Sequence, residues 1–284
     1  MSNQAFRVQG NANLSGSIQP QGAKNEALQI ISAVLLTDKK VTIKNIPNIL
    51  DINKQMELLQ GLGVKIEKLS DNDYTFQADD IDTEHLSSKD YQENAKKIRG
   101  SVMLLGPMLA RFKKAFLPKP GGDKIGRRRL DTHFLGFEKL GASFNYNEDG
   151  DQYYIGAEKL KGSFILMDEI SVTGTANVLM AAVMAEGITQ IYNAACEPYL
   201  QQLCKMLNKM GAKISGVGSN LLTVEGVTCL EGCEHTILPD MIEVGSFIGL
   251  AAMTQSDITI KNAGVKELGI IPEKFRQLGI QMEI

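Results

Sequence analysis

Residues 61–68 read GLGVKIEK, and the same ending returns three times: KLGASFNY at 139–146, KMGAKISG at 209–216 and QLGIQMEI at 277–284. In each copy an amphipathic run reaches a Leu-Gly or Met-Gly pair, which is typical of a helix that ends at a C′ glycine and leads at once into a strand. The copies are separated by roughly 70 to 80 residues, a period long enough for a small α/β unit. The sequence therefore predicts an architecture built from repeats.

The first and third copies also agree upstream of this ending. LSGSI at 14–18 matches LKGSF at 160–164, and an alanine-rich helix is expected after each. The elements expected next are helix 25–36, strand 41–46, helix 49–62 and strand 74–78 in the first copy, and helix 175–185, strand 188–193, helix 198–210 and strand 221–225 in the third. Each copy approximates βαβαββ and closes a core only by packing against its neighbours.

The second and fourth copies are less regular. The second is expected to contain a helix at 94–112, kinked or partly 3₁₀ at Pro107, then a strand at 115–118 and a loop rich in glycine and arginine. The fourth is expected to contain helix 242–253 and strand 257–262, but the sequence ends before the strand that closes the other copies. Since a chain rarely stops inside a sheet unit and leaves its edge open, we expect a truncated protein or a gene fragment.

The composition is that of a soluble globular protein. Of the 284 residues 43% are hydrophobic, and the net charge of −3 gives no overall basic field that would attract nucleic acid or acidic lipid. Apolar runs fall short of the ~20 residues that span a bilayer, and the N-terminal MSNQAFRVQG is unlike a signal peptide, so we expect a cytoplasmic protein with reduced cysteines. Cys229, Cys233 and His235 match no common zinc spacing and lack a fourth ligand, so no metal is expected there.

Two stretches are suited to anions. In QGAKNEAL, residues 21–28, Lys24 and Asn25 fall where a helix start favours negative charge, although a glycine turn with a solvated lysine is the alternative. In KPGGDKIGRRRLD, residues 119–131, three arginines follow flexible glycines, and guanidinium groups suit phosphate or carboxylate oxygens. Nucleic acid is the rival partner, but the loop has no interleaved aromatics and the protein is acidic. Arg99, at the start of a helix, would by itself be a surface charge.

The combination of motifs is more specific than any one of them. In chain order they are GAKNEAL at 22–28, Arg99 with LGP at 105–107 and AR at 110–111, PGGDKIGRR at 120–128, AEG at 185–187 with EP at 197–198, GAKI at 211–214 and LPDMIEVG at 238–245. Together they resemble the UDP-N-acetylglucosamine 1-carboxyvinyltransferases of the enolpyruvyl transferase family, over essentially the whole chain.

This resemblance implies an α/β fold, the inside-out α/β barrel of enolpyruvyl transferases, with two domains of βαβαββ units hinged around a cleft. About three and two-thirds of the family's six units would be present. Residues 20–227 would form the first domain, and residues 1–19 and 228–284 would form an incomplete second domain.

The resemblance also implies a reaction. The enolpyruvyl group of phosphoenolpyruvate is transferred to the 3-hydroxyl of UDP-N-acetylglucosamine with release of phosphate, the first committed step of peptidoglycan synthesis, and no metal or organic cofactor is needed. The resemblance implies that Lys24 and Asn25 contact phosphoenolpyruvate and the sugar hydroxyl, and that Lys24 is also catalytic. It implies that Arg99 and Arg128 bind the anionic groups. Ser171 and Val172 would contact the nucleotide sugar, and Asp131 and Asp240 would lie near the substrate. The alternative for Ser171 and Asp240 is a helix-capping role.

Asp123 stands where many members of the family carry a cysteine. Its carboxyl group would be the catalytic acid that protonates the enolpyruvyl methylene carbon, which at neutral pH requires that burial raise its pKa against the nearby arginines. Because the nucleophilic thiol is missing, the resemblance predicts resistance to fosfomycin, which alkylates that cysteine. Arg129 replaces a residue that is more often proline, which is expected to loosen the loop.

The family's second domain supplies an aspartate that deprotonates the sugar hydroxyl or the intermediate, and further arginines for phosphoenolpyruvate. The sequence ends before them, so this chain alone is expected to be inactive. Two alternatives stay open: a shikimate-pathway enolpyruvyl transferase, whose Lys-Ser-rich opening motif is absent here, and a non-catalytic nucleotide-sugar-binding fragment or regulatory paralogue. The oligomeric state is also left open.

Overall fold

The computed structural model describes residues 5–10, 12–118, 130–147 and 152–284. The chain forms two compact units: unit 1 consists of Met1–Ala23 with Leu238–Ile284, and unit 2 consists of Lys24–Ile237. Within the described ranges, no helix combines the length and the apolar character that crossing a membrane requires.

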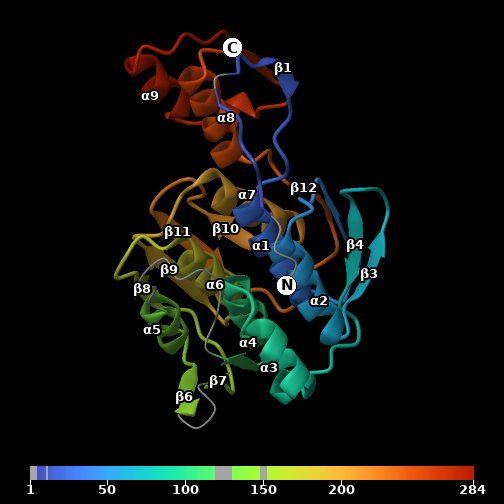
Figure 1. Ribbon diagram of the computed structural model, residues 1–284. Coiled ribbons are helices and arrows are strands. Elements are labelled where there is room, and N and C mark those ends of the chain that lie inside the picture. The colour runs from blue at the N-terminus through green and yellow to red at the C-terminus, as the bar shows by residue number, and fades with distance from the viewer. Residues whose placement is uncertain (1–4, 11, 119–129, 148–151) are drawn as a thin grey trace. The chain divides into compact units, whose positions relative to one another are not determined.

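Unit 2 contains the first three copies of the repeat (Figure 1). The first copy comprises α1 (Lys24–Ala33), η1 (Val34–Leu36), β2 (Val41–Lys44), α2 (Leu50–Gly61), β3 (Lys65–Lys68) and β4 (Tyr74–Gln77). The second comprises η2 (His85–Ser87), α3 (Lys89–Ala95), η3 (Arg99–Leu104), α4 (Leu105–Phe112), β5 (Lys114–Pro118), α5 (Asp131–Lys139), β6 (Ser143–Asn147) and β7 (Gln152–Gly156). The third comprises β8 (Phe164–Leu166), α6 (Val172–Ala182), β9 (Ile188–Tyr192), α7 (Pro198–Lys209), β10 (Lys213–Ser215) and β11 (Leu221–Glu225), and β12 (Glu234–Thr236) follows. The helices and strands expected in the first and third copies are thereby confirmed, with ends shifted by up to three residues.

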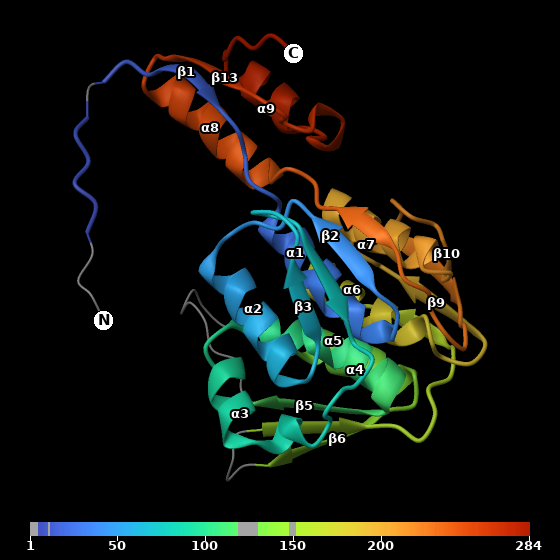
Figure 2. The same cartoon turned by 90° about the vertical axis from the view of Figure 1, so that its right-hand side faces the viewer.

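The described part of unit 2 has three sheets, ordered β12-β2-β4-β3, β10-β11-β9-β8 and β5-β7-β6. Helices α1 and α6 lie between them (Figure 2), and almost every residue of α6 is buried. A helix that is apolar on all sides must be surrounded by protein; α6 packs against α4 and α5, and α1 packs against α2 and α7. Helices inside and sheets outside are the arrangement expected of an inside-out barrel.

The glycine in each repeated ending has a left-handed backbone. The φ angles are +99° at Gly63, +94° at Gly141, +100° at Gly211 and +86° at Gly279. An L side chain is strained in this region, whereas glycine is not. At Gly63 a Cβ atom would also lie 2.4 Å from the backbone oxygen of Asp80. The C′ glycines inferred from the sequence are confirmed.

Unit 1 contains β1 (Ser15–Ile18), α8 (Met241–Met253), β13 (Asp257–Ile260), η4 (Val265–Glu267) and α9 (Ile271–Gln277). The strand expected after the fourth glycine is wrong, because residues 280–284 form none. In the other copies the equivalent strand pairs with the closing strand, as β3 does with β4, and residues 280–284 have no such partner in the described chain. They line an open cavity of about 730 Å³ together with apolar residues of α8 and β13.

Two strands are exchanged between the first and fourth copies. Strand β1 opens the first copy in sequence, yet it pairs in parallel with β13 of the fourth. Strand β12 opens the fourth copy and pairs in parallel with β2 of the first, so it belongs to unit 2. The division into domains at 20–227, with 1–19 and 228–284, stays a prediction.

The single helix expected at 94–112 is wrong, because this stretch consists of α3, η3 and α4. The 3₁₀ segment η3 precedes Pro107, which has no N–H to donate to the carbonyl of Met103. The 3₁₀ part expected near Pro107 is therefore present, but it lies N-terminal to the proline.

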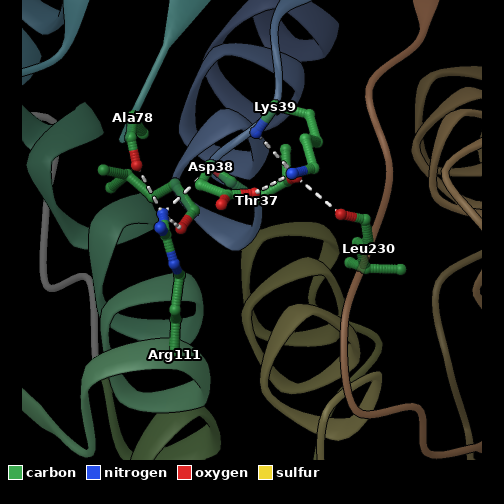
Figure 3. A network of polar contacts seen from close by, with 7 residues as sticks. Thr37, Asp38, Lys39, Ala78, Arg111 and Leu230 are labelled. Atoms are coloured by element: carbon green, nitrogen blue, oxygen red, sulfur yellow. Dashed lines mark hydrogen bonds and ion pairs between the residues drawn. The ribbon is translucent and has the colours of Figure 1, made fainter. Parts of the chain in front are cut away.

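Arg111 ties two separate chain segments to the end of α4 (Figure 3). Its Nη1 donates to the carbonyl oxygens of Leu35 at 3.1 Å, Thr37 at 3.0 Å and Ala78 at 2.7 Å. Thr37 is itself buried and donates through Oγ1 to the carbonyl of Leu230 at 2.6 Å. Carbonyls at the ends of η1 and β4, which have no partner inside their own elements, are satisfied in this way.

Candidate functional site

The predicted site residues of unit 2 that the structure describes lie at helix starts. Lys24 is the first residue of α1, Arg99 of η3, Asp131 of α5 and Val172 of α6, and Ser171 is the N-cap residue of α6. The first backbone N–H groups of a helix have no partner within it and favour an anion. Lys24 and Arg99, from two different repeats, thus combine a helix start with a side chain suited to an anionic ligand.

Lys24 is half-exposed, and its Nζ contacts Asp51 Oδ2 in the first turn of α2. The contact joins the starts of α1 and α2. An ion pair at such an exposed site contributes little stability, so an anionic ligand can compete with Asp51 for the ammonium group at small cost. Asn25 is exposed beside Lys24.

Arg99 is half-buried and lies close to both α1 and α5. At the next residue, Gly100, a Cβ atom would lie 2.8 Å from Leu28 Cδ2, which is one turn along α1 from Lys24. On the other side, burial and then the positive charge of Arg99 lower the pKa of His133 from 6.5 to about 4. His133 is therefore neutral near pH 7.

The starts of α5 and α6 are joined by side-chain hydrogen bonds. Thr132 Oγ1 donates to Asp168 Oδ1 at 2.6 Å, and Thr173 Oγ1 lies 3.3 Å from His133 Nε2. Ser171 Oγ accepts from the N–H of Gly174 at 3.1 Å. These contacts fix the Ser171–Val172 segment against the first turn of α5, which begins at Asp131.

Ser171 and Asp240 both cap helices, as the alternative reading of the sequence anticipated. Asp240 belongs to unit 1, where its carboxylate accepts from the N–H of Ile242 at 2.8 Å at the start of α8. Capping occupies one oxygen and does not prevent contact with a ligand. The predicted Asp123 and Arg128 lie outside the described residues, so no contact is assigned to either.

Sequence reasoning missed Asp51, Thr132 and Asp168 as neighbours of the site. Thr132 directly follows the predicted Asp131, so adjacency was its only signal. Asp51 and Asp168 come close to the site through packing between repeats, which no local pattern encodes. Their contacts join α1 to α2 and α5 to the segment before α6.

The described residues contain no cluster of three or more His, Cys, Asp or Glu side chains arranged to bind a metal. Of the three residues considered for zinc, His235 is buried with its Nε2 at 2.8 Å from Glu26 Oε1. Burial raises the pKa of the Cys233 thiol, which disfavours the thiolate that zinc requires.

The fold is that of the enolpyruvyl transferases. The structure of the enolpyruvyl transferase NikO from Streptomyces tendae matches 98% of this chain and 65% of its own with a TM-score of 0.82 at 19% identity. The EPSP synthase from Acinetobacter baumannii matches 95% of this chain and 60% of its own with a TM-score of 0.71 at 17% identity. The fold class expected from the sequence is confirmed.

The chain belongs to the EPSP synthase family, because the sequence model described as EPSP synthase (3-phosphoshikimate 1-carboxyvinyltransferase) matches residues 8–284. It is 62% identical over 279 residues to a UDP-N-acetylglucosamine 1-carboxyvinyltransferase of Bacteroides fragilis, 58% to one of Porphyromonas gingivalis and 48% to one of Treponema denticola. The matches cover 97–98% of this chain and 63–64% of those relatives. The resemblance read from the motifs is confirmed, and the chain spans less than two-thirds of the length of these relatives.

Proposed function

We propose that the protein to which this chain belongs transfers the enolpyruvyl group of phosphoenolpyruvate to the 3-hydroxyl of UDP-N-acetylglucosamine, in the synthesis of peptidoglycan. The observation that carries the proposal is the 62% identity, over 98% of the chain, to a relative named UDP-N-acetylglucosamine 1-carboxyvinyltransferase. The cationic side chains at the starts of α1 and η3 support it, because both substrates are anions.

In the proposed reaction the sugar 3-hydroxyl adds to C2 of phosphoenolpyruvate while Asp123 gives a proton to C3. A base takes the hydroxyl proton, and the tetrahedral intermediate then loses a proton from C3 and expels phosphate to restore the double bond. Lys24 and Arg99 would stabilise the charge on the phosphate and carboxylate, with Arg128 on the loop. Asn25 would contact the sugar hydroxyl, and Asp131, Ser171 and Val172 would position the nucleotide sugar.

The domain assignment and the cellular location belong to the same proposal. Residues 20–227 would form the first domain, and residues 1–19 and 228–284 would belong to the second. A cytoplasmic location follows from the substrates, since phosphoenolpyruvate and the nucleotide sugar are made inside the cell.

Release of inorganic phosphate from phosphoenolpyruvate and UDP-N-acetylglucosamine tests the proposal. We expect turnover from the protein at the full length of its relatives and none from the 284-residue chain. The chain should still bind UDP-N-acetylglucosamine in calorimetry, and Asp131→Asn should weaken binding at least tenfold, whereas Glu138→Gln near the other, exposed end of α5 should not. Turnover with shikimate 3-phosphate in place of the nucleotide sugar would overturn the assignment. Binding without turnover by the full-length protein would favour the non-catalytic alternative.

The aspartate at position 123 gives a second test. With no thiol at this position, the full-length protein is expected to keep its activity during incubation with fosfomycin, while Asp123→Cys should become sensitive to it. The measurement is residual phosphate release against time of incubation. Time-dependent covalent inactivation of the unaltered protein would contradict the prediction.

A further inference from the structure

Asn177 lies in the middle of α6 and is fully buried. Its side-chain amide makes hydrogen bonds to three elements outside α6, and Nδ2 also makes a longer contact of 3.8 Å to Met103 Sδ. Oδ1 accepts from the N–H of Gly106 at 2.8 Å, and Nδ2 donates to the carbonyl of Val102 at 3.0 Å and lies 3.0 Å from His133 Nδ1. One buried amide thus contacts η3, α4 and α5, and all its strong donors and acceptors are used.

Gly106 and Val102 are four residues apart, the spacing of one α-helical hydrogen bond. Here the N–H of Gly106 and the carbonyl of Val102 both bond to the Asn177 amide. The amide is therefore inserted into the backbone hydrogen bonds at the point where η3 changes to α4. The carbonyl of Val102 also accepts from the N–H of Leu105, a bond of the 3₁₀ type. Asn177 therefore stabilises the 3₁₀ geometry of the segment that begins with Arg99.

The close approach of α4 and α6 depends on the glycine at 106. A Cβ atom on Gly106 would lie 2.3 Å from the backbone oxygen of Asn177. The next residue, Pro107, has no N–H and cannot continue the ladder. The junction between η3 and α4 thus has an amide insertion at Gly106 and a missing donor at Pro107, and Asn177 of α6 supplies the partners of the Gly106 N–H and the Val102 carbonyl.

The same amide determines which nitrogen of His133 carries its proton. Nδ2 has two hydrogens; one is directed to Val102, and the other to His133 Nδ1. His133 Nδ1 must then be an acceptor, so the ring is neutral with its proton on Nε2, facing Thr173 Oγ1 at 3.3 Å. The lowered pKa of His133 agrees with a neutral ring.

We propose that Asn177 is a positioning residue that fixes Arg99, through η3, relative to the first turns of α5 and α6. The inference rests on the proposed function, because Arg99, Asp131 and Ser171 are the groups assigned there to the anionic substrates. Asn177 touches no substrate in this scheme. It acts by holding three helix starts from two different repeats in one arrangement.

The test compares Asn177→Asp with the matched control Asn208→Asp in the 284-residue chain. Asn208, on α7, also binds backbone through its amide, accepting from the N–H of Ile214 and donating to its carbonyl, both at 2.9 Å. Each substitution keeps the acceptor oxygen and removes the donors. The measurements are the tautomer of His133 from long-range ¹H–¹⁵N spectra, amide exchange across η3, and calorimetric binding of UDP-N-acetylglucosamine.

In the unaltered chain we expect the proton of His133 on Nε2. Asn177→Asp should place a proton on Nδ1, speed exchange of the Val102–Gly106 amides at least tenfold and weaken nucleotide-sugar binding at least tenfold. Asn208→Asp should leave all three readouts unchanged. The proposal would be overturned by a proton on Nδ1 of His133 in the unaltered chain, or by unchanged amide exchange and tautomer in Asn177→Asp. Where the unaltered chain binds measurably, an unchanged affinity of Asn177→Asp for the nucleotide sugar would also overturn it. Absence of binding by the unaltered chain would count against the proposed function alone, because the tautomer and exchange measurements need no ligand and still decide the positioning role.

Discussion

Arg111→Met is expected to lower the free energy of unfolding of unit 2 by about 1.5 to 3 kcal/mol. The substitution keeps an unbranched apolar stem of similar length and removes the guanidinium. Three carbonyls at the ends of η1 and β4 then lose their donor, at distances of 2.7 to 3.1 Å (Figure 3). The loss should fall on the contacts between α4 and the first copy, because these carbonyls belong to Leu35, Thr37 and Ala78.

The magnitude follows from the geometry. Nη1 has two hydrogens, so its three acceptors amount to about two full hydrogen bonds, with the shortest to Ala78. Each bond from a charged donor contributes roughly 1.5 to 3 kcal/mol, which gives about 3 to 6 kcal/mol for the pair. Arg111 is half-exposed, so water replaces part of what is lost and the expected net change is about half of that sum.

Urea unfolding followed by far-UV circular dichroism measures the change. Lys209→Met is the matched control, since Lys209 is also a cation in the last turn of a helix, is exposed and has no comparable set of carbonyl partners in the described structure. It should cost less than about 1 kcal/mol, the contribution of a charge near a helix C-terminus. If Arg111→Met costs no more than Lys209→Met, the reasoning about the three carbonyls is refuted.

Three further changes test the interior of unit 2. Burial lowers the pKa of His133 from 6.5 to about 4, so only the unfolded chain takes up a proton on this residue between these pH values. The stability present above pH 6.5 should therefore fall by about 3 kcal/mol by pH 4, and His133→Gln should remove that part of the pH dependence in urea titrations. Stability curves against pH that run parallel for the unaltered chain and the variant would contradict this. Gly136→Ala should lower the stability by about 2 kcal/mol, because its Cβ would lie 2.2 Å from Val178 Cγ2. The same substitution made in a Val178→Ala background should cost much less, and equal costs in the two backgrounds in thermal unfolding would rule out the clash. Glu26→Leu should cost about 1 to 3 kcal/mol by leaving Nε2 of the buried His235 without its hydrogen-bond partner. Glu26→Leu with His235→Leu should cost less than the sum of the single variants, and strictly additive unfolding energies would disprove this.

The repeat could be predicted from the sequence because the glycines that end its helices are required by the local backbone conformation. A glycine with positive φ at the end of a helix is a requirement of the backbone, so Gly63 and its three equivalents mark helix ends wherever the chain folds. The exchange of β1 and β12 could not be predicted in the same way. LSGSI at 14–18 and LKGSF at 160–164 have the same pattern, yet the first contains β1, which pairs with β13, whereas the second only leads into β8 at Phe164, and β8 pairs with β9 of its own copy. Which copy supplies the partner depends on packing between repeats.

The candidate site shows the same division between local and tertiary information. Lys24, Arg99 and Asp131 could be named from the sequence because each lies in a stretch that carries the family resemblance, and their roles stay predictions. Asn177 could not, because a polar residue inside an apolar helix has no local signature of its partners.

Its partners explain why a neutral histidine can lie beside Arg99. The amide hydrogen directed at His133 Nδ1 disfavours a second proton there, and burial acts in the same direction. The positive charge at these helix starts therefore comes from the side chains of Lys24 and Arg99. A site with this source of charge can attract a phosphorylated acid across the physiological pH range without a titrating histidine.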